Sequence, residues 1–151
     1  LLIFGSGEES DALLKLCETL NLASCVKFLG HAPNFTQKLR DVDVLVTPSI
    51  ANEDMPYVLV EAAAAGKACI GTNLAGIPEV VSHGVSGLIV EPGNVEQLSS
   101  AMLKMLEDRA FWKECSEAAK RSYLANHSLQ ICIKSYKSVY EQANNSVITP
   151  C

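Results

Sequence analysis

Residues 44–72 read VLVTPSIANEDMPYVLVEAAAAGKACIGT, and this stretch decides the fold. Two short apolar runs, 44–47 and 68–71, enclose a polar loop and an Ala-rich stretch with helical character, 56–65. Strands that alternate with helices are typical of a parallel sheet, and runs that are apolar throughout are typical of strands covered on both faces. The stretch therefore predicts a β–α–β unit.

The same alternation continues on both sides of this unit. Further apolar runs lie at 1–4, 26–29 and 88–90, and further helical patterns lie at 11–20, 35–40 and near 78–82. In the first of these helices Leu13, Leu14, Leu16, Cys17 and Leu20 have the spacing of a helix laid on a sheet. After residue 93 only helical patterns follow, at 95–106, 111–124 and 129–140. We predict an α/β fold with a doubly wound, Rossmann-like parallel sheet and C-terminal helices, formed by residues 1–143 and followed by a disordered tail, 144–151.

The composition of the chain argues against several classes of protein. The net charge of −5 argues against a nucleic-acid partner, because there is no basic stripe to neutralise phosphates. No apolar run approaches the roughly 20 residues of a membrane helix, and the first residues do not resemble a signal peptide. A chain that opens on an apolar strand without Met is expected to be part of a larger protein. The six cysteines have no metal-ligand spacing, and Cys17, Cys69 and Cys132 lie among apolar neighbours, so we expect a cytoplasmic protein without a structural metal.

The loop before the central helix is the candidate ligand site, since ligands of such folds bind at the carboxyl ends of the strands. A helix that starts near Pro56 leaves the amides of Tyr57, Val58 and Leu59 without partners at the positive end of the helix dipole. Amides in that position suit a diphosphate.

Two glutamates flank this helix start. Glu61 lies inside the apolar helix, where a carboxylate needs hydrogen-bond donors, and two ribose hydroxyls would supply them. Alternatively, Glu61 is a structural carboxylate that caps a neighbouring loop. Glu53 lies in the loop before the helix, and its charge suits sugar hydroxyls beyond the diphosphate better than the phosphates themselves.

Several motifs together resemble the glycogen-synthase-like retaining glycosyltransferases of family 4, which have the GT-B fold. The motifs lie at 26–30, 48–67, 76–81 and 84–93, in the same order as in that family, and the resemblance extends from about Leu2 to Leu106. The resemblance implies a C-terminal donor-binding domain for a UDP-sugar or a GDP-sugar, with no cofactor and no metal.

The resemblance also implies roles for individual residues. Glu53 would be the catalytic residue that contacts the donor sugar, and Glu61 would hold the ribose. The remaining donor-binding residues would be Met55, Pro56, Tyr57 and Val58 around the phosphates, and Gly30, His31, Ala32 and Asn34 against the base.

This sequence also departs from the family pattern. Asp54 and Pro56 stand where many members have Gly, and Ala68-Cys69 stands where Pro-Val is common. The phosphate-binding Arg and Lys, the first strand and the N-terminal acceptor domain of the family are all absent from these residues. The resemblance therefore implies a glycan-synthesising enzyme of which this piece alone is inactive, and peripheral membrane association of the full-length enzyme only.

A second function stays open, that of a non-catalytic nucleotide-binding or regulatory α/β module such as a phospho-acceptor domain. Such a domain needs aspartates at the strand ends, whereas Asp41 and Asp43 precede their strand. Residues 5–7, Gly-Ser-Gly, favour a tight turn over a dinucleotide-binding fingerprint, because Ser10 occupies the third glycine position.

Overall fold

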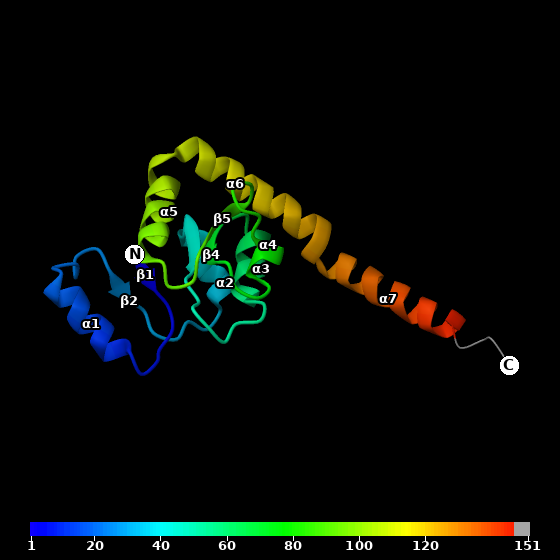
Figure 1. The fold of residues 1–151 in the computed structure, drawn as a ribbon, viewed down its shortest axis with the longest axis horizontal. Helices are drawn as coiled ribbons and strands as arrows, with labels where there is room; N and C mark the ends of the chain where they lie inside the picture. Colours follow the sequence, from blue (N-terminus) through cyan, green and yellow to red (C-terminus); the bar gives the residue numbers. More distant parts are fainter. Residues whose placement is uncertain (147–151) are drawn as a thin grey trace. The chain divides into compact units, whose positions relative to one another are not determined.

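The computed structural model describes residues 1–146 and shows an α/β architecture in which every strand pair is parallel (Figure 1). The chain forms two compact units, residues 1–37 and 38–151. All five predicted strands are present. They belong to two sheets instead of one, with two strands in the first unit and three in the second.

The first unit contains a short parallel pair of strands. β1 (Leu2–Ile3) lies beside β2 (Lys27–Phe28), with Leu2 opposite Lys27, and α1 (Ser10–Thr19) connects the two strands. α2 (Phe35–Lys38) follows at the end of this unit, and a 3-10 turn, η1 (Leu39–Asp41), begins the second unit. The predicted helices at 11–20 and 35–40 are therefore confirmed.

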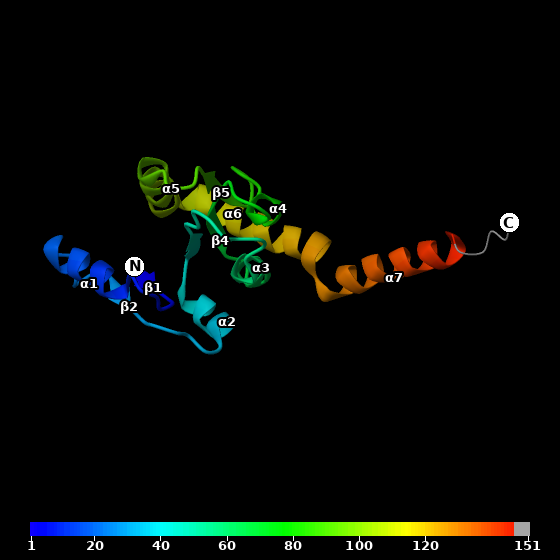
Figure 2. The ribbon, with the colours of Figure 1, turned by 60° about the horizontal axis from the view of Figure 1, so that its bottom comes forward.

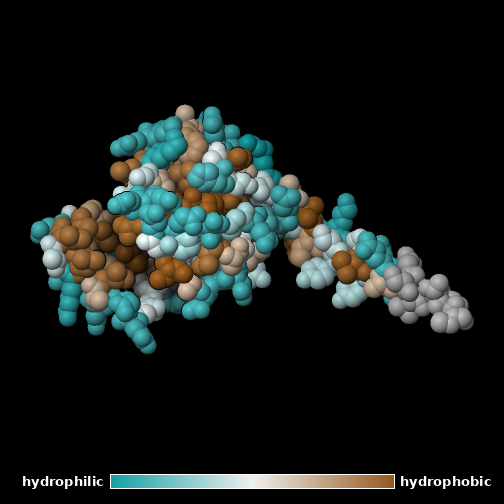
Figure 3. All heavy atoms as spheres, viewed as in Figure 1, coloured by the Kyte–Doolittle hydropathy of each residue, from teal (hydrophilic) through white to brown (hydrophobic). Residues whose placement is uncertain are grey.

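α1 buries less of its apolar stripe than predicted. Cys17 is buried, whereas Leu13, Leu14, Leu16 and Leu20 are each between 44% and 55% exposed. Hydrophobic atoms accordingly gather on this unit, seen on the left in Figure 3. The reason is the size of the sheet, because strands of two residues each offer too small a face to cover a ten-residue helix.

The second unit contains a three-stranded sheet. Its strands are β3 (Val44–Thr47), β4 (Ala68–Thr72) and β5 (Gly87–Val90), in the order β3-β4-β5. Thr47 lies opposite Gly71, and Thr72 lies opposite Val90. The carboxyl ends of the three strands therefore meet at one edge, where the loop after β3 begins.

One face of this sheet forms the main core with α5 (Val95–Glu107) and α6 (Arg109–Ser122). Alternate strand residues point to this face, as the pleat requires. The buried members are Ala68, Ile70, Leu88, Val90, Ala101, Met105 and Cys115. Val44, Val46, Phe111 and Trp112 pack around them. β4 is buried along its whole length, as expected for the central strand.

The opposite face is covered by α4 (Ile77–Val80). A Cβ atom placed on Gly71 would lie 2.5 Å from Cγ2 of Ile77, so this helix packs directly on β4. α3 (Tyr57–Ala64) connects β3 to β4 and contacts both strands. Figure 2 shows these helices around the sheet from a second direction. The predicted parallel sheet with helices on both faces is thus confirmed for this unit.

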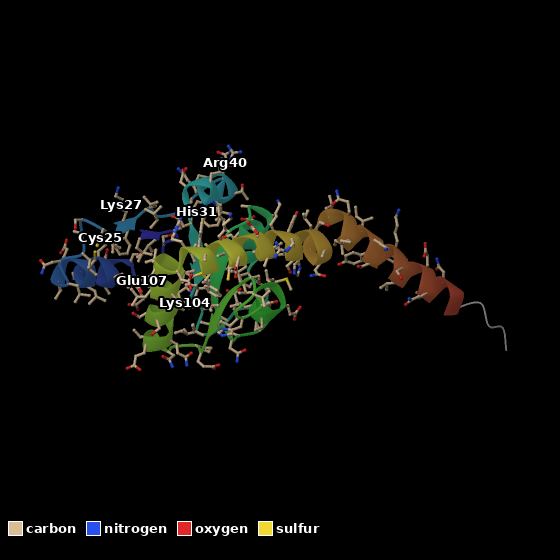
Figure 4. The ribbon with its side chains drawn as sticks, turned by 90° about the horizontal axis from the view of Figure 1, so that it is seen from above. Cys25, Lys27, His31, Arg40, Lys104 and Glu107 are labelled. Carbon is tan, nitrogen blue, oxygen red and sulfur yellow. The ribbon has the colours of Figure 1, made fainter. Side chains whose placement is uncertain are left out.

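The corner between α5 and α6 ties these helices to the amino end of β3. Asp108 caps α6 by accepting a hydrogen bond from the Phe111 amide at 2.9 Å, and Lys104 donates to its other oxygen at 3.3 Å. These contacts, the Phe111 amide first, hold the pKa of the Asp108 carboxyl below its ordinary value. The indole N–H of Trp112 donates to the Asp43 carbonyl at 3.0 Å. Lys104 is labelled in Figure 4.

The described residues after β5 are helical, as predicted. A π-helical segment, η2 (Tyr123–His127), leads from α6 into α7 (Leu129–Ser146). α7 continues past Asn144, the predicted start of the tail, and the rest of that predicted tail lies outside the described residues. Among residues 1–146, no helix combines the length and the hydropathy needed to cross a bilayer.

The cysteines differ in their surroundings. Cys17, Cys69 and Cys115 are buried, and burial raises the pKa of the Cys69 thiol to about 12, so this thiol acts as a small apolar side chain. Cys132, predicted to lie among apolar neighbours, is instead exposed. It belongs to α7, most of whose side chains face solvent, and this explains the difference.

Candidate functional site

The site begins where β3 ends. Residues 48–56 form a loop that leads into α3, and Pro56 occupies the N-cap position with an extended backbone (φ −71°, ψ 108°). The helix start predicted near Pro56 is therefore confirmed. At the other end of α3, Gly66 adopts a φ of +68°, and the ammonium group of Lys120 donates to the Ala64 carbonyl. A cation in that position interacts favourably with the helix dipole.

Glu53 is held in this loop by a chain of two hydrogen bonds. Oγ of Ser49 donates to Oε2 of Glu53 at 3.0 Å. Oγ1 of Thr72, at the end of β4, donates to the Ser49 carbonyl at 2.8 Å. Thr72 is only 2% exposed, and Glu53 is half-buried. The buried end of β4 is thus connected to the carboxylate that the sequence predicts as catalytic.

A second connection runs from the β4–α4 turn to the same loop. The Gly76 amide donates to the Asp54 carbonyl at 2.6 Å. A Cβ atom on Gly76 would lie 2.8 Å from that oxygen and 3.2 Å from Cβ of Met55, so a side chain at this position would push the loop away. Met55 is half-buried and Pro56 is buried. The loop around Glu53 is therefore anchored on both sides of the glutamate.

Ala75 stores strain in the turn that makes this second connection. Its φ is +46°, in the left-handed region, which costs a residue with a Cβ about 1–2 kcal/mol. We expect Ala75→Gly to raise the free energy of unfolding by about 0.5–1 kcal/mol, because part of the relief is offset by the greater freedom of Gly in the unfolded chain. Urea unfolding measures this change. Ala51→Gly, at an exposed loop position without a positive φ, is the control and should give no gain; a loss of stability in Ala75→Gly would contradict the expectation.

The start of α3 faces outward. Tyr57 is 77% exposed and Val58 is half-buried. In the described part of the chain their amides have no acceptor outside the helix, and the first turn of a helix supplies none inside it. The Leu59 amide, predicted to be free as well, instead donates to the Pro56 carbonyl at 3.0 Å, because the extended Pro56 at the N-cap turns its carbonyl toward the first helical turn. Two free amide donors, and not the predicted three, therefore stand at the positive end of the helix dipole.

Glu61 lies on α3 and is half-buried. Its carboxylate has no hydrogen-bond or ion-pair partner among residues 1–146. The structure therefore gives no support to the alternative in which Glu61 caps a neighbouring loop. A half-buried carboxylate without a partner in the protein is available to accept hydrogen bonds from a ligand.

The segment predicted to contact the base, residues 30–34, belongs to the first unit. The Gly30 carbonyl accepts a hydrogen bond from the Gly5 amide at 2.8 Å, which holds the start of the segment beside the end of β1. The rings of Phe4 and Phe35 meet edge to face, with centroids 5.4 Å apart, and hold its far end. His31 and Asn34 are exposed, Ala32 is half-buried, and His31 is labelled in Figure 4.

Two residues that support Glu53, Ser49 and Thr72, were not predicted from the sequence to have a role. A hydroxyl residue at or just past the carboxyl end of each of two neighbouring parallel strands is the signal that could have found them, because such residues meet at one sheet edge.

The features considered for other functions have structural explanations. The turn at 5–7 is closed by Ser10, whose hydroxyl accepts a hydrogen bond from the Gly7 amide at 3.1 Å, as a tight turn before a helix requires. Asp43 lies at the amino end of β3 and pairs with Arg109 at 4.0 Å, away from the carboxyl ends that a phospho-acceptor site needs. Within residues 1–146, no group of three or more His, Cys, Asp and Glu side chains could hold a metal ion.

The chain matches known proteins in sequence. The sequence model of the family described as Glycosyl transferases group 1 matches residues 1–122. The chain is 31% identical over 140 residues to N-acetyl-alpha-D-glucosaminyl L-malate synthase from Bacillus anthracis; the match covers 93% of this chain and 36% of that protein. The chain therefore spans about a third of the length of this curated relative.

Two solved structures have the same fold. Anabaena Alr3699/HepE, in complex with UDP, matches with a TM-score of 0.82 and 25% identity over 93% of this chain and 40% of its own. The C-terminal domain of the group 1 protein LpcC from Francisella tularensis matches with a TM-score of 0.74 and 18% identity, over 82% of this chain and 66% of its own. The predicted resemblance to these glycosyltransferases is confirmed. The chain belongs to the family Glycosyl transferases group 1.

Proposed function

We propose that residues 1–143 are the nucleotide-sugar-binding domain of a retaining glycosyltransferase. The domain would hold the diphosphate of a UDP-sugar or GDP-sugar and present the sugar to an acceptor bound by another domain of a longer enzyme. The expectation that neither a cofactor nor a metal ion is needed stays a prediction.

One observation carries this proposal: two half-buried carboxylates flank a helix start with free amides. The amides of Tyr57 and Val58 suit the diphosphate. The Glu61 carboxylate accepts no hydrogen bond within the described residues, so both of its oxygens can accept hydrogen bonds from the ribose hydroxyls. Glu53 accepts only one hydrogen bond within the described residues, from Ser49. A carboxylate can accept several hydrogen bonds, so Glu53 can also bind sugar hydroxyls.

The comparisons support the nucleotide part of this proposal. The Anabaena protein, which shares the fold and 25% of its residues over the match, binds UDP in its crystal. Residues 30–34 in the first unit are the segment we assign to the base. His31 and Asn34 are exposed there and can donate or accept hydrogen bonds.

Positioning would account for most of the catalysis. The helix dipole and the amides of α3 stabilise the negative charge that develops on the departing diphosphate. Glu53 orients the sugar so that its anomeric carbon faces the acceptor, which removes part of the entropic barrier. Both contributions depend on a rigid loop 48–56.

We expect this chain by itself to bind nucleotide sugars weakly and to transfer nothing. The donors at the helix start are neutral amides, the chain carries a net charge of −5, and both Lys38 and Arg40 are exposed. Each absent charge-assisted phosphate contact lowers the affinity by about ten- to a hundredfold. We therefore expect the dissociation constant for a nucleotide sugar to be nearer to about 1 mM than to about 1 μM.

Titration followed by NMR tests the proposal. UDP, UDP-glucose, GDP and GDP-mannose are added in turn to the ¹⁵N-labelled chain, and a glycosyl-transfer assay is run in parallel. The amide resonances of Tyr57 and Val58 should shift the most. Shifts confined to Lys27 and Lys67, which lie at the amino ends of their strands, would contradict the site, and micromolar binding would contradict the weak affinity.

A further inference from the structure

Glu53 follows an exposed segment of the loop 48–56. Ile50 is 72% exposed, Ala51 and Asn52 are also exposed, and Asn52 adopts a left-handed backbone with φ +54°. A glutamate side chain at the end of such a segment samples several rotamers unless something holds it. Among residues 1–146, the Ser49 hydroxyl is the one hydrogen-bond donor recorded to its carboxylate, at 3.0 Å.

The backbone of Ser49 is itself held by the sheet. Ser49 is the second residue after the end of β3. Its carbonyl accepts the hydrogen bond from Oγ1 of Thr72 at 2.8 Å. Thr72 is the last residue of β4 and is almost fully buried, so its position is set by the pairing of β3 with β4. The order Thr72–Ser49–Glu53 leads from the buried central strand of the sheet to the loop 48–56.

We infer that Ser49 is a positioning residue for Glu53, and that Thr72 fixes Ser49 in turn. Ser49 donates to Oε2 alone, so Oε1 of Glu53 is left to accept a hydroxyl of the donor sugar. This inference rests on the proposed function, in which Glu53 binds the sugar.

A positioning role predicts an effect on the sugar and not on the nucleotide. We expect Ser49→Ala to bind UDP as the wild type does, and to lose about tenfold in its preference for UDP-glucose over UDP, because Glu53 is no longer oriented. Thr72→Val should cause a smaller loss of the same kind. Ser49→Thr keeps the hydroxyl and should restore the preference.

The measurement is the ratio of the two dissociation constants, obtained by NMR titration of the full chain with UDP and UDP-glucose and, in parallel, with GDP and GDP-mannose. Ser99→Ala, which removes an exposed hydroxyl on α5, is the matched control and should change nothing. Glu53→Gln is combined with Ser49→Ala, because a residue that acts through Glu53 should cause no further loss once the carboxylate is gone. Thermal unfolding of each variant shows whether the fold is kept.

The outcomes separate this inference from the proposed function. A wild-type chain without preference for either nucleotide sugar over its nucleotide would overturn both. A clear wild-type preference that Ser49→Ala leaves unchanged would overturn the role of Ser49 alone. Equal losses of UDP and UDP-glucose binding, or additive losses in the double variant, would show that Ser49 supports the loop in general, and would also overturn that role.

Discussion

Gly87→Ala is expected to leave little folded protein. A Cβ atom at this position would lie 2.1 Å from the Cys69 carbonyl oxygen and 2.7 Å from Cγ1 of Val81. Gly87 pairs with Cys69 in the β4–β5 ladder, so the clashing carbonyl belongs to the central, buried strand and cannot move without breaking the sheet. We expect a loss of about 4 kcal/mol or more, a large share of the total stability of a domain of this size.

Circular dichroism during urea unfolding measures this loss. Gly7→Ala is the control, because a Cβ atom there meets no atom within 4 Å and the backbone does not have a positive φ. The control should change stability by less than about 1 kcal/mol. A Gly87→Ala variant as stable as Gly7→Ala would mean that β4 and β5 are not packed as described.

Glu61→Ala should weaken binding of the nucleoside diphosphate by about 10- to 100-fold. This corresponds to about 1.5–3 kcal/mol for the loss of hydrogen bonds to a charged acceptor. Binding of inorganic pyrophosphate should stay unchanged, because it needs only the amides of Tyr57 and Val58. The fold should be kept, since the Glu61 carboxylate has no partner within the described residues that its removal would orphan.

NMR titration with UDP, GDP and pyrophosphate measures the three affinities. Glu107→Ala removes an exposed carboxylate of α5, labelled in Figure 4, and controls for the change in net charge. Equal affinity of wild type and Glu61→Ala for both nucleotides would exclude the ribose role. A parallel loss of pyrophosphate binding would show instead that Glu61 supports the start of α3.

The sequence by itself determined the elements and their order. The apolar runs at 44–47 and 68–71 became β3 and β4 because strands covered on both faces must be apolar throughout. The helix start at Pro56 could be predicted because capping depends on a few neighbouring residues. Glu53 and Glu61 could likewise be singled out from their positions before and inside one helix. All of these inferences rest on contacts close in sequence.

Only the tertiary structure decided what supports the site. α1 is exposed, and the strands divide into two sheets, because each sheet offers only a limited surface. The spacing of apolar residues in the sequence does not reveal how large that surface is. The lack of space at Gly87 and the hydrogen bond from Thr72 to Ser49 depend on the register of the strands. Ser49 and Thr72 are 23 residues apart in the chain, and they meet because Thr47 pairs with Gly71. Register is set by the packing of the whole sheet, so no local pattern could reveal which hydroxyl would hold Glu53.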